Sequence, residues 1–202
     1  IKIIVDTDGD LIKENGNKYP IITMTEEEVE SLNEKLKKAY IEGKVPDLEE
    51  KIGKSNGIIL VDASVKDMGF ILSKKLVKLW IKWVVEYAFW NKVRGILLAI
   101  DPIKSIDNTD VLGEIRIARK AGVNLVLTTR EWGIFREMHI DFGTNVLMRT
   151  DNRAYYDLSS RFIEFKHTLP RVVPNLKTGE AIVVRRYLEP DYEYVKLDRE
   201  EL

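Results

Sequence analysis

Several aspartates in this chain stand where a short apolar run ends. Asp6 and Asp8 lead into a turn at Gly9 after one such run, and Asp101 directly follows another. Magnesium prefers carboxylate oxygens held on a rigid element, and it neutralises phosphate charge in phosphoryl transfer. Asp101, Asp6 and Asp8 are therefore candidate metal ligands. Aspartates in such positions also accept hydrogen bonds from backbone N–H groups and stabilise turns, so both interpretations stay open.

Other common catalytic motifs are missing from the sequence. It has no cysteine, and its two histidines, His139 and His167, do not show metal-ligand spacing. It contains neither a serine-nucleophile motif nor a G-x-G-x-x-G turn. It also has no G-x-x-x-x-G-K-[ST] loop, whose backbone amides and lysine hold nucleotide phosphates. The sequence therefore offers no thiol chemistry and no phosphate loop.

The composition is that of a compact protein. Of its 202 residues 45% are hydrophobic and 32% charged, with a formal net charge of -1, a balance that favours one sizeable core over disorder. This net charge gives no global attraction to nucleic acid, although local patches can still bind it. No apolar run reaches the roughly 18 residues of a membrane span, and no leader segment is visible. We therefore expect a cytoplasmic location and no membrane partner.

Apolar strands alternate with helices along the chain. The expected strands are residues 3–5, 57–61, 95–100, 123–127, 145–148 and 181–184. One expected helix begins at a capping box of Thr25 with Glu28. Three further helices are expected at residues 68–90, 109–120 and 152–165. Strands that are apolar on both faces predict an α/β fold, with a mostly parallel sheet and helices on both faces. We expect one domain at residues 1–187 and a charged tail at residues 188–202.

In such a sheet the functional site lies beyond the carboxyl ends of the strands. The polar residues that follow the expected strands should therefore meet at one edge. These residues are Asp6, Asp8, Asp62, Asp101, Thr128, Thr129, Arg130 and Arg149. The pattern locates a site without naming a reaction.

Six segments occur in an informative order. They are D-T-D-G-D at residues 6–10, the strand at 57–64, the strand that ends on Asp101, residues 114–123 with a basic pair before a glycine, and residues 143–149 and 176–181. Together they resemble the HerA and FtsK group of DNA-translocating P-loop ATPases, whose second strand reads roughly D-P-H-G-E. The resemblance covers most of the chain from residue 3 to residue 184, and corresponds to the part of the motor core that follows the Walker A loop.

The resemblance implies a RecA-like P-loop NTPase core with ATP and Mg²⁺ as cofactors. It assigns Asp101 to the metal, Arg130 to the sensor position near the phosphates, and Arg119 to the nucleotide of a neighbouring subunit. The other residues that it places at the nucleotide are Thr128, Thr129 and Lys120. The partners that it implies are a homo-oligomeric ring, DNA, and a partner nuclease or an upstream part of the ATPase.

The departures from the family fall on catalysis. Pro102 follows Asp101 where the family has the glutamate that activates water, and proline offers no base. Arg130 stands where the family usually has glutamine, and the Walker A loop is missing. We therefore expect a degenerate or truncated member that acts in DNA processing, translocation or packaging and does not hydrolyse ATP by itself. Whether the chain is an enzyme stays open.

The missing loop has a topological consequence. In this family the strand before the Walker A loop lies in the middle of the sheet, so its loss would leave two strand edges unpaired. Either that strand lies upstream of Ile1, or residues 181–184 fill the position, or the strand order differs from the family's.

Two other functions remain open at this stage. One is a metal-dependent nuclease or phosphotransferase that uses the strand-end aspartates. The other is a non-enzymatic scaffold whose polar edge binds a partner protein.

Overall fold

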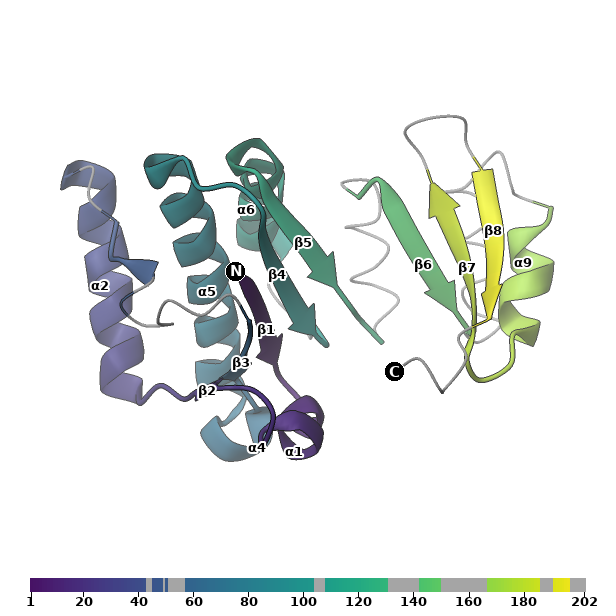
Figure 1. The fold of residues 1–202 in the computed structure, drawn as a ribbon, viewed down its shortest axis with the longest axis horizontal. Coiled ribbons are helices and arrows are strands. Elements are labelled where there is room, and N and C mark those ends of the chain that lie inside the picture. Colours follow the sequence, from purple (N-terminus) through teal and green to yellow (C-terminus); the bar gives the residue numbers. More distant parts are fainter. Residues whose placement is uncertain are drawn as a thin grey trace. The chain divides into compact units, whose positions relative to one another are not determined.

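The computed structural model describes residues 1–42, 45–48, 50, 57–103, 108–130, 142–149, 167–185 and 191–196. The chain divides into two compact units, Ile1–Ile134 and Phe135–Leu202. Each unit is built on a sheet of its own (Figure 1). No helix in the described ranges is long and apolar enough to cross a membrane.

The first unit contains a five-stranded parallel sheet. Its strands are β1 (Lys2–Asp6), β2 (Ile21–Ile22), β3 (Ile58–Asp62), β4 (Ile96–Asp101) and β5 (Val123–Leu127). They lie in the order β2-β3-β1-β4-β5, and every neighbouring pair is parallel. The predicted α/β fold with a mostly parallel sheet is therefore confirmed, with β1 at its centre.

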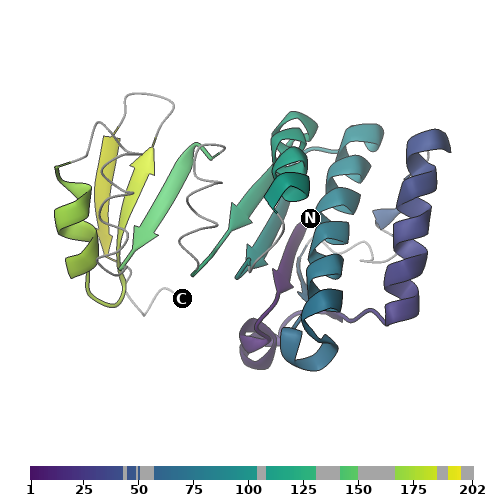
Figure 2. The ribbon, with the colours of Figure 1, turned by 180° about the vertical axis from the view of Figure 1, so that it is seen from behind.

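Helices connect these strands. They are α1 (Asp10–Asn15), α2 (Glu26–Glu42), α4 (Val65–Met68), α5 (Phe70–Asn91) and α6 (Asn108–Ala121). The predicted capping box before α2 is confirmed, because the Thr25 N–H donates to the Glu28 carboxylate at 2.9 Å and the Glu28 N–H donates to the Thr25 hydroxyl at 3.3 Å. The long helix α5 packs against both α2 and α6, so these three helices form one layer (Figure 2).

The core lies between this helix layer and one face of the sheet. Alternate side chains of the central strands are fully buried there, among them Ile3 and Val5 of β1 and Leu98 of β4. Trp80 and Trp83 of α5 add a tilted aromatic pair with ring centroids 5.2 Å apart. Trp90, in the last turn of α5, does not belong to this core, because 47% of its surface is exposed.

The opposite face of the parallel sheet is also apolar but is covered less in the described part of the chain. Ile4 of β1 and Leu97 of β4 are half-buried, and Val126 of β5 is 47% exposed. Within the same residues β5 pairs with β4 alone, so one of its edges carries backbone groups without a strand partner. Its sequence V-N-L-V-L has no proline and no charge, the usual protections of an edge strand.

The second unit contains an antiparallel sheet of β6 (Thr144–Met148), β7 (Glu180–Arg185) and β8 (Asp191–Lys196). A short helix α9 (Leu169–Val172) and the 3-10 helix η3 (Val173–Asn175) precede β7. The expected strands at residues 145–148 and 181–184 exist, but their assignment to the parallel sheet is wrong. Since β7 pairs with β6 on one side and β8 on the other, residues 181–184 do not fill a position in the parallel sheet.

Part of the charged tail is folded. Residues 191–196, which the sequence places in the tail, form β8 and pair with β7 in register from Asp191↔Arg185 to Lys196↔Glu180. The helix expected at residues 152–165 lies outside the described residues.

A buried carboxyl group lies where α5 packs against α6. Glu86 of α5 is 8% exposed, and its Oε2 has no hydrogen-bond partner in the described structure. Burial raises the pKa of Glu86, with a further rise from the nearby carboxylate of Glu114 on α6; Lys82, whose Nζ lies 3.7 Å from Oε1, acts in the opposite direction. Burial also raises the pKa of Glu114. Ionised Glu86 is therefore a destabilising group.

We expect Glu86→Gln to raise the free energy of unfolding at pH 7 by about 1 kcal/mol, because the amide avoids the burial of a charge. A raised pKa means that the folded state binds more protons than the unfolded state. The contribution of Glu86 to wild-type stability should therefore be greatest below the unfolded value of 4.5 and be lost as pH rises through the folded pKa. The gain from the substitution should shrink as pH falls toward 4.5. Urea unfolding between pH 4.5 and pH 8 measures both effects.

The matched control is Glu34→Gln on the exposed face of α2. The Lys37 ammonium, 2.7 Å from Oε1, lowers the pKa of Glu34, so this substitution should give no gain at pH 7. A loss of stability in Glu86→Gln at pH 7 would show that the ion pair with Lys82 outweighs the cost of burial.

Candidate functional site

Parallel pairing brings three aspartates to the same level at the carboxyl edge of the sheet. In register, Asp6 of β1 lies opposite Asp62 of β3 and opposite Asp101 of β4. The chain leaves β1 toward β2 and β3 on one side, whereas it leaves β4 toward β5 on the other side. Ligands of open parallel sheets bind where the connections diverge in this way. The candidate site therefore lies at the ends of β1 and β4.

Asp6 organises the loop that follows β1. Its side chain is buried, and Oδ1 accepts the N–H groups of Asp8 at 3.1 Å and Gly9 at 2.8 Å, while Oδ2 accepts the N–H of Ile12 at 2.9 Å. Gly9 has a φ of 78°, a conformation that favours glycine, and an added Cβ would lie 3.3 Å from Cβ of Ser64. This geometry supports the turn-stabilising interpretation of Asp6.

Asp101 is held from the neighbouring strand. The hydroxyl of Thr128, directly after β5, donates a hydrogen bond to Oδ1 of the partly exposed Asp101. The next residue, Pro102, is buried and is joined to Asp101 by a cis peptide bond. Its carbonyl accepts a hydrogen bond from the hydroxyl of Thr7. The Ile103 N–H then donates to the Thr128 carbonyl at 2.8 Å. The segment after β4 is thus fixed to both neighbouring strands, and the residue after Asp101 carries no carboxylate.

An ion pair crosses the end of β4. Nη2 of Arg130, which follows β5, lies 3.7 Å from Oδ2 of Asp8, which follows β1. Since β4 lies between β1 and β5, this pair spans the strand that carries Asp101. The structure therefore gathers six predicted residues at one edge. They are Asp6, Asp8, Asp62, Asp101, Thr128 and Arg130, with Thr129 in the same segment.

Three predicted residues lie elsewhere. Arg119 and Lys120 are in the last turn of α6, which runs from the carboxyl edge back to the start of β5. A helix of 14 residues is about 20 Å long, so these two side chains stand near the opposite edge of the sheet, and the structure does not bring them to Asp101. Arg149 follows β6 of the second sheet and not a strand of the parallel sheet.

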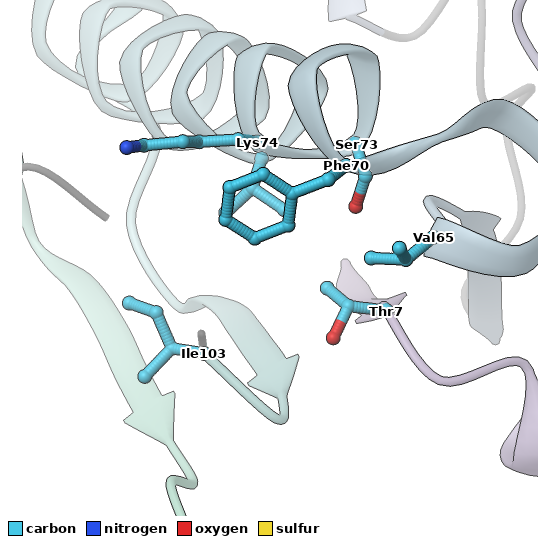
Figure 3. A pocket seen from close by; sticks show the side chains of 7 residues that line it. Thr7, Val65, Phe70, Ser73, Lys74 and Ile103 are labelled. Carbon is cyan, nitrogen blue, oxygen red and sulfur yellow. The ribbon is translucent and has the colours of Figure 1, made fainter. Parts of the chain in front are cut away.

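A small pocket lies beside the edge on the helix side. Figure 3 shows Thr7, Val65 and Ile103, from the segments after β1, β3 and β4, facing the first turns of α5. Its remaining lining residues are Phe70, Ser73, Lys74 and Val77. Most of this lining is apolar. The hydroxyls of Thr7 and Ser73 already donate to the carbonyls of Pro102 and Ala63. The sequence did not predict this pocket, since the order of the strands decides which segments meet there.

The geometry bears on the metal hypothesis. In the part of the chain that the structure describes, no group of three or more histidine, aspartate or glutamate side chains is placed to hold a metal ion. Asp6 already accepts three backbone N–H groups, whereas Asp101 accepts one side-chain hydroxyl and is partly exposed. Asp101 is therefore the carboxylate best suited to contact a metal ion that a ligand brings with it.

Comparison with solved structures identifies the architecture. The genome packaging NTPase B204 from Sulfolobus turreted icosahedral virus 2, in complex with ATP-gammaS, matches 97% of this chain and 96% of its own chain with a TM-score of 0.54 and 12% identity. The bacterial conjugative coupling protein TrwBdeltaN70 matches 98% of this chain and 78% of its own with a TM-score of 0.58 and 12% identity.

The chain shares its α/β fold with these two proteins. A DNA-packaging ATPase B204 from Sulfolobus turreted icosahedral virus also matches, at 11% identity and a TM-score of 0.50 over 98% of both chains. No protein-family profile and no curated protein matches the sequence. At these low sequence identities the comparisons establish a shared fold and nothing further.

We expect Asp6→Ala to lower the free energy of unfolding by about 3 kcal/mol, because three backbone N–H groups lose their acceptor. Asp62→Ala is the matched control, since the Asp62 carboxylate accepts the Ser64 N–H at 3.0 Å at the same register position. Its loss should be about 1 kcal/mol. Urea unfolding of both variants measures the difference, and equal losses would contradict the role given to Asp6.

Proposed function

We propose that this chain is part of a DNA-translocating or DNA-packaging NTPase core. It carries the metal-binding Asp101 and the sensor residue Arg130, and it does not hydrolyse ATP by itself. The observation that carries the proposal is the setting of Asp101. It ends β4 next to the central strand, at the divergence of the connections, and Thr128 holds one of its oxygens. The fold that this chain shares with B204 and TrwBdeltaN70 supports a nucleotide as the ligand.

The proposed lack of independent hydrolysis rests on the two residues beside Asp101 that depart from the family pattern, Pro102 and Arg130. Attack of water on a phosphate needs a residue that orients or deprotonates the water. Pro102 provides no such group, and its segment is fixed by hydrogen bonds to the residues that follow β1 and β5. Arg130 can contact phosphate oxygens through its guanidinium, but it is not a base.

The phosphate loop of the complete motor would come from a further strand. The edge of β5 that has no strand partner in the described structure supports this step, because it is apolar, lacks the usual protections and adjoins the sensor segment at Thr128 to Arg130. A strand added there in parallel would place the loop at its carboxyl end next to Arg130 and close to Asp101. That strand would come from a segment outside the described residues or from another chain.

The proposed partners are DNA and further copies of the chain. The comparison proteins are named for genome packaging and for conjugative coupling, which supports DNA as the substrate on which the motor acts. Arg119 is exposed at the edge away from Asp101. This placement suits an arginine that reaches the nucleotide of a neighbouring subunit in a ring, and Lys120 beside it would share that contact.

We expect Asp101→Ala to weaken magnesium-dependent binding of a non-hydrolysable ATP analogue at least tenfold, since the metal loses its carboxylate. Isothermal titration calorimetry on the protein as encoded, so that any residues beyond 1–202 are included, measures this affinity with and without Mg²⁺. Asp62→Ala is the control, because Asp62 stands at the same register position on the other side of β1, and it should bind as the wild type does. No ATP turnover is expected from any of the three proteins.

Two outcomes would contradict the proposal. One is binding of the analogue that Asp101→Ala leaves unchanged. The other is magnesium-dependent cleavage of nucleic acid without ATP, which would instead support the nuclease function.

A further inference from the structure

The ion pair between Asp8 and Arg130 has two unequal members. The Asp8 side chain is 18% exposed, and its backbone N–H donates to the buried Asp6 carboxylate at 3.1 Å. The two other N–H bonds to Asp6 hold the rest of this loop. The Arg130 side chain is 81% exposed. The backbone that carries the short Asp8 side chain is therefore held by its loop, whereas the long, exposed guanidinium side chain of Arg130 can turn about its own torsions.

The position of the pair matters for any phosphate ligand. Asp8 and Arg130 meet over the end of β4, where Asp101 stands, so a phosphate group near Asp101 would arrive beside both. A guanidinium binds a phosphate through two parallel N–H bonds, which a carboxylate 3.7 Å away from a single nitrogen does not match. Asp8 and the phosphate group would therefore compete for the same cation.

We propose that Asp8 is an internal competitor for Arg130. With the site empty, Asp8 holds the guanidinium and lowers the positive potential at the edge; a phosphate group that binds takes Arg130 away from it. The exchange is accessible because an exposed ion pair is weak, worth at most a factor of about five in an equilibrium constant. This inference rests on the proposed nucleotide site, and it adds a residue that limits phosphate affinity.

The test is a double-mutant cycle on the binding of inorganic triphosphate without Mg²⁺, which removes any metal contact of Asp8. The four proteins are the wild type, Asp8→Asn, Arg130→Gln and the double variant, each measured by calorimetry at low salt. We expect Asp8→Asn to tighten binding about two- to fivefold and Arg130→Gln to weaken it. In the Arg130→Gln background, Asp8→Asn should tighten binding clearly less, because only the direct repulsion between the carboxylate and the phosphates is then removed.

Asp10→Asn is the matched control for charge. Asp10 is an exposed aspartate of the same segment, paired with Lys13 at 3.5 Å, and its substitution removes the same charge without touching Arg130. It should leave triphosphate affinity close to that of the wild type. Equal tightening by Asp10→Asn, or equal tightening by Asp8→Asn in both Arg130 backgrounds, would overturn the inference in favour of a general field effect.

The cycle also separates this inference from the proposed function. If the wild type binds the magnesium–nucleotide analogue through Asp101 but Asp8→Asn leaves triphosphate affinity unchanged, the competition is refuted and the proposed function stands. If no variant binds triphosphate and none binds the nucleotide analogue, both are refuted.

Discussion

The in-register parallel pairing of β1 with β3 and β4 is the constraint on which the candidate site depends. It sets Asp6, Asp62 and Asp101 at one level of the sheet, and it makes the boundary between β1 and β4 the point where the chain connections diverge. Because β4 is the only strand between β1 and β5, groups that follow β1 and β5 can meet over the end of β4. A change of one residue in this register would turn the strand-end side chains to the other face of the sheet and separate them.

The carboxylates at this edge have different tasks because their surroundings differ. Asp6 is buried and uses both oxygens for backbone N–H groups, so it shapes the loop. Asp101 is partly exposed and is oriented by one hydroxyl from the next strand, which leaves it able to contact a ligand. Asp8 faces a guanidinium. Burial and hydrogen bonding, and not the residue type, decide which aspartate stabilises the fold and which is available for binding.

Sequence patterns predicted the elements better than their assembly. Apolar runs located every long strand of the parallel sheet, and the capping box located the start of α2, because both signals are local. Residues 145–148 and 181–184 were misassigned since a short apolar run has the same pattern in a parallel and in an antiparallel sheet. The alternation in D-Y-E-Y-V-K at residues 191–196 fits a strand, but its charged residues fit an exposed tail equally well. The pair of Asp8 with Arg130 needs the strand order, which no local pattern contains.

The central claim is that a nucleotide binds at the carboxyl end of β4 with its metal ion on Asp101. A crystal structure of the protein with Mn²⁺ and a non-hydrolysable ATP analogue tests it most directly, because anomalous scattering locates the metal. We expect the metal within coordination distance of Asp101, with the backbone hydrogen bonds to Asp6 intact and the Arg130 guanidinium bound to a phosphate group. A metal ion and nucleotide bound away from β4, or a metal held by Asp6 with its loop rearranged, would contradict it.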